Sequence, residues 1–84
     1  MVHCYELDGS QMQDLEQAHI YLKMHLYLPD YYGMNLDALF DCLTELQEET
    51  FFWLNASDKI HPKLLHVLEK SAAENPFLTV ISAN

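Results

Sequence analysis

The chain is organised around the segment Leu28-Pro-Asp-Tyr-Tyr-Gly-Met-Asn-Leu-Asp-Ala-Leu-Phe-Asp-Cys-Leu-Thr-Glu45, which predicts a loop that runs into a helix. Pro29 disfavours the α region for the residue before it, so an earlier helix should end here. Gly33 offers a backbone that can adopt a positive φ, as tight turns ahead of helices often require. Asn35 is a favourable N-cap for a helix predicted over residues 36–47. Periodic leucines give this helix one apolar face: Leu36, Leu39, Leu43 and Leu46.

The other face of this helix carries a stripe of acidic residues. Asp37, Asp41 and Glu45 follow one another at i, i+4 spacing, and each like-charge pair costs an isolated helix about 0.2–0.5 kcal/mol. Helix stability therefore does not explain the stripe, which leaves two interpretations: a solvated face of an acidic protein, or a surface that docks a positive partner. Three neighbouring aromatic residues favour the second, since aromatic side chains anchor many interfaces: Tyr31, Tyr32 and Phe40.

Composition limits the classes of function. The chain has 84 residues, which suits a single domain over residues 1–84, and half of them are hydrophobic, as in a globular protein. Its formal charge of −9 comes from thirteen acids against four lysines, with no arginine. Nucleic acids and anionic membrane surfaces are therefore disfavoured as partners, whereas a basic protein would be attracted over a long range.

Signals for export or membrane insertion are absent from the sequence. No run approaches the roughly 18 apolar residues of a membrane span, and the N-terminal residues lack the features of a signal peptide. We therefore expect a cytoplasmic location. Cys4 and Cys42 could form at most one bridge. Reduced, separately packed thiols are the simpler hypothesis, and a disulfide stays open because the sequence gives no distance between them.

Three short apolar or β-compatible runs predict strands near residues 2–7, 50–55 and 77–82. Within the second run, Phe51–Leu54 suggests a strand that is buried on both faces. Strands that alternate with helical patterns are typical of parallel sheets. The sequence therefore predicts an α/β fold, with a small three-stranded parallel sheet packed with about three helices.

Two further helices complete this prediction. Asp14, followed by Gln17, resembles a capping box and predicts a helix over residues 15–26. Pro62 suits the first turn of a later helix, which Asn75-Pro76 should end. Apolar residues recur every four positions through this later helix: Ile60, Leu64, Leu68 and Ala72.

No pattern typical of an enzyme or a metal site is present. There is no His-Glu-x-x-His motif, Cys-x-x-Cys pair, Gly-rich phosphate loop or Gly-x-Ser-x-Gly elbow. We expect no catalytic activity, no cofactor and no metal. All five histidines are expected to be surface or boundary residues: His3, His19, His25, His61 and His66.

Two arrangements could still support catalysis. Asp37 and Asp41 could form a carboxylate pair of the glycosidase kind, but one helix face in so small a domain offers no second wall for a substrate. Cys42 as a nucleophile would need electropositive surroundings, whereas it follows Asp41 in an acidic helix, which raises the pKa of a thiol. A packed thiol is the better hypothesis.

The segment Leu28–Glu45 resembles the loop and helix of the barstar family, which are intracellular inhibitors of the secreted ribonuclease barnase. The shared pattern is Leu-Pro-acidic-Tyr-Tyr-Gly-x-Asn-Leu-Asp-Ala-Leu-aromatic-Asp-Cys-Leu-Thr, and it is specific because it fixes many positions in order. Outside the segment the resemblance is one of element order and length, with few identities. The parallel three-stranded sheet of the family agrees with the elements predicted above.

The resemblance implies an inhibitor that plugs the active site of a barnase-type ribonuclease with this loop and helix, its carboxylates mimicking RNA phosphate. It implies that Asp41 is the main phosphate mimic and that Asp37 is a second acidic contact. The further contact positions that it implies are Tyr31, Gly33, Asn35, Leu36, Phe40 and Thr44. The implied partner is a basic protein, a secreted microbial ribonuclease, in a toxin-immunity setting, and the free inhibitor is expected to be a monomer.

The sequence departs from the family pattern in three places. Phe40 stands where barstar has a tryptophan, and Asn55–His61 is shorter, so a short helix there should be trimmed or lost. His61-Pro62-Lys63 stands where the family presents a glutamate from the start of its last helix. A lysine on that rim keeps an alternative open: a barstar-like protein-binding module, or an immunity protein, for a basic partner that is not a ribonuclease.

Overall fold

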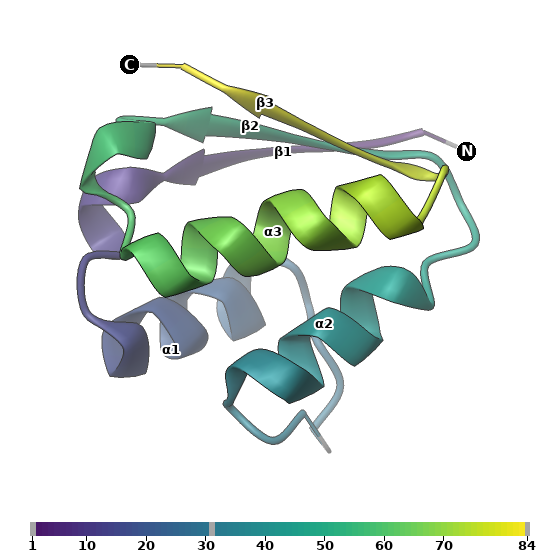
Figure 1. Ribbon diagram of the computed structural model, residues 1–84. Coiled ribbons are helices and arrows are strands. Elements are labelled where there is room, and N and C mark those ends of the chain that lie inside the picture. The colour runs from purple at the N-terminus through teal and green to yellow at the C-terminus, as the bar shows by residue number, and fades with distance from the viewer. Residues whose placement is uncertain (1, 31, 84) are drawn as a thin grey trace.

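Three parallel strands form the sheet, in the order β1-β2-β3 (Figure 1). The computed structural model describes residues 2–30 and 32–83. The strands are β1 (His3–Asp8), β2 (Thr50–Asn55) and β3 (Leu78–Ser82). The predicted α/β fold class, the parallel pairing and the approximate strand positions are therefore confirmed.

All of the helices lie on one side of this sheet, with α3 next to it and α1 and α2 farther below (Figure 1). Their bounds are Leu15–His25 for α1, Leu36–Thr44 for α2 and Pro62–Glu74 for α3. Two 3₁₀ turns, η1 (Gly9–Gln11) and η2 (Ser57–Lys59), follow β1 and β2. The turn η2 occupies the shortened segment in which the family resemblance implied a trimmed helix.

The hydrophobic core lies between the sheet and the helices. Leu7, Phe52 and Leu78 point into it from the three strands and are at most 3% exposed. Buried leucines of the helices complete it: Leu22, Leu39, Leu43, Leu64 and Leu68. The prediction that Phe51–Leu54 is buried on both faces is wrong, because no helix of the described residues covers the other face of the sheet and Trp53 remains 45% exposed.

The start of α1 follows the prediction, and its end has a specific cause. The side chain of Asp14 accepts a hydrogen bond from the backbone N–H of Gln17, as a capping residue does. The helix stops at His25 because Tyr27 adopts a left-handed backbone with φ 53°, so that the N–H of Leu28 donates back to the Lys23 carbonyl. The chain therefore turns before Pro29, and the proline follows a helix that has already ended.

Gly9 joins the two 3₁₀ turns closely. A Cβ atom at this position would lie 2.1 Å from the carbonyl oxygen of Ala56, a distance that no side chain can tolerate. Glycine is needed here for close backbone approach rather than for a positive φ. The contact fixes β1 against β2 at the ends of the strands. None of the described helices combines the length and the hydrophobicity that a membrane span requires.

Candidate protein-binding site

The N-terminus of α2 is fixed by Asn35. Its side-chain oxygen accepts a hydrogen bond from the backbone N–H of Ala38 at 2.8 Å, and its side-chain amide donates to the Gly33 carbonyl at 3.2 Å. The predicted N-cap is therefore confirmed, and the cap also closes the preceding turn. Because both ends of the Asn35 amide are used inside the chain, this residue positions the helix.

The prediction of a positive φ at Gly33 is wrong. The left-handed residue in this turn is Met34, with φ 55°. A Cβ at Gly33 would lie 3.1 Å from the Asn35 amide nitrogen, which is tighter than ordinary contact. Gly33 therefore makes room for the capping side chain, while Met34 supplies the turn.

The C-terminus of α2 is fixed by Asn75, a residue that follows α3. Its side-chain amide donates to the carbonyls of Leu43, at 2.9 Å, and Leu46, at 3.1 Å. These bonds satisfy carbonyl groups that the end of a helix leaves without partners. The helix accordingly ends at Thr44 and not at residue 47, so the predicted end is wrong. The sequence marked Asn75 only as the end of α3, and its distant partners gave no local signal.

The loop before α2 is anchored by Tyr32. Its side chain is 3% exposed and its hydroxyl forms a hydrogen bond with Nδ1 of His19, which is 5% exposed on α1. Burial raises the pKa of Tyr32 to about 12 and lowers the pKa of His19, so both groups are neutral near pH 7. The expectation that every histidine is a surface or boundary residue is therefore wrong for His19, and Tyr32 serves as a core anchor.

The acidic stripe lies on the solvent side of α2. Leu39 and Leu43 are buried against the core, whereas Asp37, Asp41 and Glu45 are exposed. Helical spacing places Phe40 and Thr44 beside these acids, and both are half-buried. The Thr44 hydroxyl donates to the Phe40 carbonyl at 2.8 Å and so is occupied within the helix. The structure thus places exposed carboxylates on a helix whose two ends are held by asparagines.

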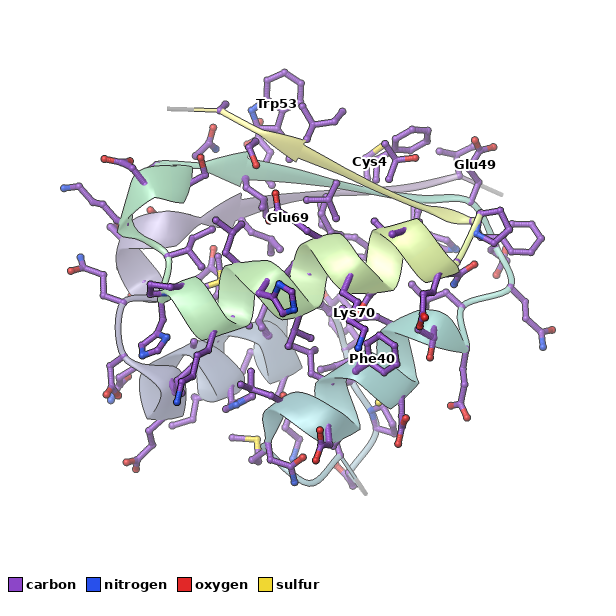
Figure 2. The ribbon with its side chains drawn as sticks, viewed as in Figure 1. Cys4, Phe40, Glu49, Trp53, Glu69 and Lys70 are labelled. Atoms are coloured by element: carbon purple, nitrogen blue, oxygen red, sulfur yellow. The ribbon has the colours of Figure 1, made fainter. Side chains whose placement is uncertain are left out.

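A lysine of α3 lies over the aromatic residue of this surface. The Lys70 ammonium is 5.2 Å from the centre of the Phe40 ring, within the range of a cation–π contact (Figure 2). Lys70 is exposed on the side where α3 packs against α2. The sequence drew attention to Lys63 as the rim cation, but the lysine that contacts the predicted site is Lys70. The spacing within α3 alone could not identify which lysine would face α2.

A groove lies at the N-terminal end of α2, between this helix and α1. It has a volume of about 640 Å³ and is lined by Leu15, Glu16, His19, Met34, Asn35, Leu36 and Asp37. Leu36, a predicted contact residue, is half-buried at its edge. Glu16 and Asp37 give the groove two carboxylates. A partner that approaches the acidic stripe can therefore place one cationic side chain in this groove and another on the outer side of α2.

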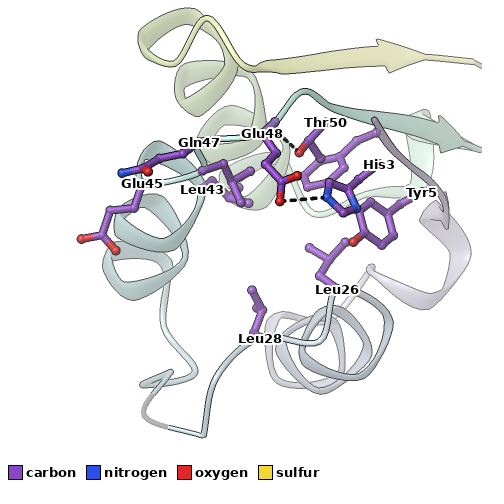
Figure 3. A pocket seen from close by; sticks show the side chains of 11 residues that line it. His3, Tyr5, Leu26, Leu28, Leu43, Glu45, Gln47, Glu48 and Thr50 are labelled. Atoms are coloured by element: carbon purple, nitrogen blue, oxygen red, sulfur yellow. Dashed lines mark hydrogen bonds and ion pairs between the residues drawn. The ribbon is translucent and has the colours of Figure 1, made fainter. Parts of the chain in front are cut away.

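A second hollow lies behind the C-terminal end of α2 (Figure 3). It has a volume of about 390 Å³, and its apolar lining includes Leu26, Leu28 and Phe52. His3 and Glu48 form an ion pair across its mouth, with 3.4 Å between Nε2 and Oε1. It opens where β1 and β2 begin, whereas the ligands of open parallel sheets bind where strands end. Its position gives no support to a catalytic site.

The geometry also bears on the thiol and metal hypotheses. Both cysteines are free; Cys42 is half-buried, but Cys4 is exposed, so the prediction of two packed thiols is wrong for Cys4. Burial, together with the nearby Glu45 and Asp41 carboxylates, raises the pKa of Cys42, as expected for a poor nucleophile. Among the described residues, no cluster of three or more His, Cys, Asp or Glu side chains could hold a metal ion.

The structure brings most of the predicted contact residues into one region. Asp37, Phe40, Asp41 and Thr44 share the outer side of α2, while Gly33 and Asn35 lie at its N-terminal end. Tyr31 lies outside the described residues. Sequence reasoning missed Lys70, which contacts the site, and His19 and Asn75, which hold it from other elements.

Comparison with known proteins identifies the family of the chain. A stretch of 38 residues, 45% of this chain, is 55% identical to the Bacillus subtilis (strain 168) protein named "Putative ribonuclease inhibitor YrdF". That stretch spans 42% of the length of this relative. The family model described as "Barstar (barnase inhibitor)" matches residues 2–74, which run from the start of the sheet to the end of α3. The chain therefore belongs to the barstar family.

Proposed function

We propose that the chain inhibits a barnase-type ribonuclease by placing α2 and its preceding loop in the active site of the enzyme. The observation that carries the proposal is the pair of exposed carboxylates, Asp37 and Asp41, on a helix that is capped at both ends. The family description and the name of the relative both refer to ribonuclease inhibition. In this role the chain is a protein ligand and has no catalytic activity of its own.

The physical basis is charge mimicry on a rigid support. A ribonuclease must hold RNA phosphate with cationic side chains, and a carboxylate can accept the same charge-assisted hydrogen bonds. Asp41 lies in the middle of α2 and would take the central phosphate position, with Asp37 one turn away. Because the helix and loop are already ordered by Asn35 and Tyr32, little conformational entropy would be lost on binding.

The remaining contact positions would complete the surface. Phe40 supplies an aromatic face beside Asp41, and Leu36 supplies apolar area at the edge of the groove. Gly33 and Asn35 would act through the shape of the loop, since their groups are used within it. Tyr31 and Thr44 are proposed as further contacts. A cytoplasmic inhibitor of this kind would protect the cell that produces the ribonuclease.

The test is an inhibition assay with fluorogenic RNA and purified barnase-type ribonucleases, barnase among them. We expect stoichiometric inhibition by the parent chain. Asp41→Ala should weaken binding by about 3–5 kcal/mol, because the cations of the partner lose their counter-charge in a buried site. Asp37→Ala should act in the same direction and less strongly.

The matched control is Asp58→Ala, which removes the same charge from the exposed turn η2. This variant should inhibit nearly as well as the parent chain. Inhibition that survives Asp41→Ala, or failure of the parent chain against the whole panel, would contradict the proposal.

One observation favours a second candidate, a protein-binding module for a basic partner that is not a ribonuclease. Lys70 places a cation over Phe40, inside a surface that is otherwise acidic. The cations of a ribonuclease site would be repelled where they approach Phe40, whereas a different basic partner could meet Asp37 and Asp41 with its cations and place an apolar or acidic group beside Lys70. Binding to a basic protein that depends on Asp41 but leaves RNA cleavage unchanged would favour this candidate.

A further inference from the structure

The outer sheet face, opposite the helices, is open and largely apolar. Parallel pairing aligns its outward residues in rows across the sheet: Cys4, Phe51 and Thr79 in one, and Glu6, Trp53 and Ile81 in the next. Figure 2 shows Trp53 and Cys4 on the side of the sheet away from α3. Trp53 is 45% exposed and Ile81 is 38% exposed. A hollow of about 450 Å³ runs between these side chains.

An open face is unusual for this kind of sheet. Sheets built only of parallel strands are almost always covered on both faces, because their strands carry apolar residues on both sides. Here the helices of the described residues all lie on one side (Figure 1). Contiguous exposed apolar side chains on a soluble domain are typical of an interaction surface. The face therefore has the character of a surface that another molecule covers.

The indole of Trp53 is held in a fixed orientation on this face. Its Nε1–H donates to the side-chain oxygen of Asn55, two residues along β2, at 3.1 Å. A fixed aromatic ring loses little rotamer freedom when a partner packs on it, which is a property of interface anchors. The neighbouring residue in the same row is Glu6, so the ring lies next to a carboxylate.

The charges on this face select the occupant. Among the described strand residues that point outward, the carboxylates are Glu6 and Asp8 from β1, and none is a lysine or histidine. Lys59 of η2 lies near Asp8, so Glu6 is the carboxylate that is left for a partner. Glu6 makes no ion pair with another described residue. A second copy of the chain would bring these carboxylates together and add another charge of −9, so repulsion opposes self-association. A carboxylate beside an indole is suited to a cation, since both attract one.

We propose that the outer sheet face binds a partner protein through an apolar segment that carries a lysine or arginine. The cation would pack on the Trp53 indole and pair with Glu6, while apolar side chains cover Phe51 and Ile81. The outer sheet face and α2 lie on opposite sides of the molecule (Figure 1). The chain could therefore hold this partner while α2 is engaged, and the inference does not depend on the proposed inhibition.

Trp53 provides a direct measurement, because it is the single tryptophan of the chain and its emission reports on this face alone. The probe is a short synthetic peptide of alternating leucine and lysine, compared with a leucine–glutamate peptide of the same length. We expect the leucine–lysine peptide to shift the Trp53 emission to shorter wavelength and to reduce its quenching by acrylamide. The leucine–glutamate peptide should have no effect.

Variants that keep Trp53 identify the site. Glu6→Gln should weaken binding of the leucine–lysine peptide about three- to fivefold, which is the loss of affinity expected for one exposed ion pair. Ile81→Ser should weaken peptide binding further. The far-UV circular dichroism spectrum of this variant tests whether the variant is folded. Two controls on the helical side should bind as the parent does: Glu16→Gln, which makes the same charge change on α1, and Asp41→Asn on α2.

Several outcomes would overturn the inference. No emission change with the leucine–lysine peptide, or a change that Asp41→Asn abolishes and Glu6→Gln leaves intact, would exclude this face as the site. A blue shift that grows with protein concentration alone, with dimers in sedimentation, would assign the face to a second copy. A blue shift on phosphatidylserine–phosphatidylcholine vesicles but not with the peptide would assign it to a membrane surface.

Discussion

The hydrogen bond between His19 and Tyr32 shows how two residues hold the loop before α2 in place. Both side chains are buried, and each would cost free energy if its polar atom had no partner. Together they join α1 to the loop that precedes α2. The position of the acidic helix therefore depends in part on His19, which is neutral near pH 7 and becomes charged when the pH falls.

We predict that the stability of the protein falls on mild acidification because of His19. Its pKa in the folded state is lowered by burial from an ordinary value of 6.5, so the unfolded chain binds more protons in this range. The stabilising contribution is complete above pH 6.5 and is lost as the pH falls through the lower, folded-state pKa. Urea unfolding between pH 8 and about pH 5 measures it.

His19→Gln cannot titrate and should flatten this pH profile. The matched control is His66→Gln on the exposed side of α3, which should leave the profile unchanged. Asp8 and Glu48 also have lowered pKa values, but these carboxyl groups titrate below the pH range of this experiment and do not affect the profile. A His19→Gln profile that matches the parent at every pH would contradict the prediction.

The acidic stripe should be tolerated rather than required by the fold. Asp41 lies between Asp37 and Glu45 on one face of α2, and each like-charge pair opposes the helix by about 0.2–0.5 kcal/mol. We predict that Asp41→Ala leaves the free energy of unfolding unchanged or raises it by this amount. Thermal or urea unfolding measures the change. Loss of the folded state in Asp41→Ala would instead give the stripe a structural role.

At the scale of elements, α2 is a short helix whose length is set by its neighbours. Asn35 begins it from the loop, and Asn75, after α3, ends it. Because α3 also brings Lys70 over Phe40, this helix and the residue that follows it both end α2 and line its proposed binding surface. Substitutions at the C-terminal end of α3 should therefore alter the stability and the surface of α2.

We predict that Asn75→Ala destabilises the protein by about 2–3 kcal/mol. The substitution removes the amide bonds to Leu43 and Leu46 and the bond from the Phe77 N–H, at roughly 1 kcal/mol each. Urea unfolding measures the loss. Gln47→Ala, an exposed change close to the end of α2, is the control and should alter stability by less than about 0.5 kcal/mol. Equal effects of the two variants would argue against Asn75 as the anchor.

At the scale of the whole molecule, the charge of −9 governs encounter with a partner. We predict that association with a basic ribonuclease slows as salt rises, since long-range attraction is screened over about 10 Å at 0.1 M ionic strength. Stopped-flow fluorescence from low to high NaCl measures the association rate. Asp41→Asn and Asp58→Asn should both lower the rate slightly, and Asp41→Asn alone should greatly raise dissociation. An association rate that is independent of salt would contradict electrostatic steering.

Features that depend on local pattern can be predicted from the amino-acid sequence. Periodic leucines, Asn35 and the short apolar runs are sufficient to predict the helices, the parallel sheet and an acidic face on α2, because periodicity and capping act within a few residues. Features that join distant segments depend instead on how the whole chain packs. The side chain of Asn75 bonds to the Leu43 carbonyl across 32 positions, and the buried His19 bonds to Tyr32 of a different segment. The outer sheet face stays open for the same reason: an apolar strand looks the same in sequence whether one face is covered or two, and only the placement of the helices decides between them.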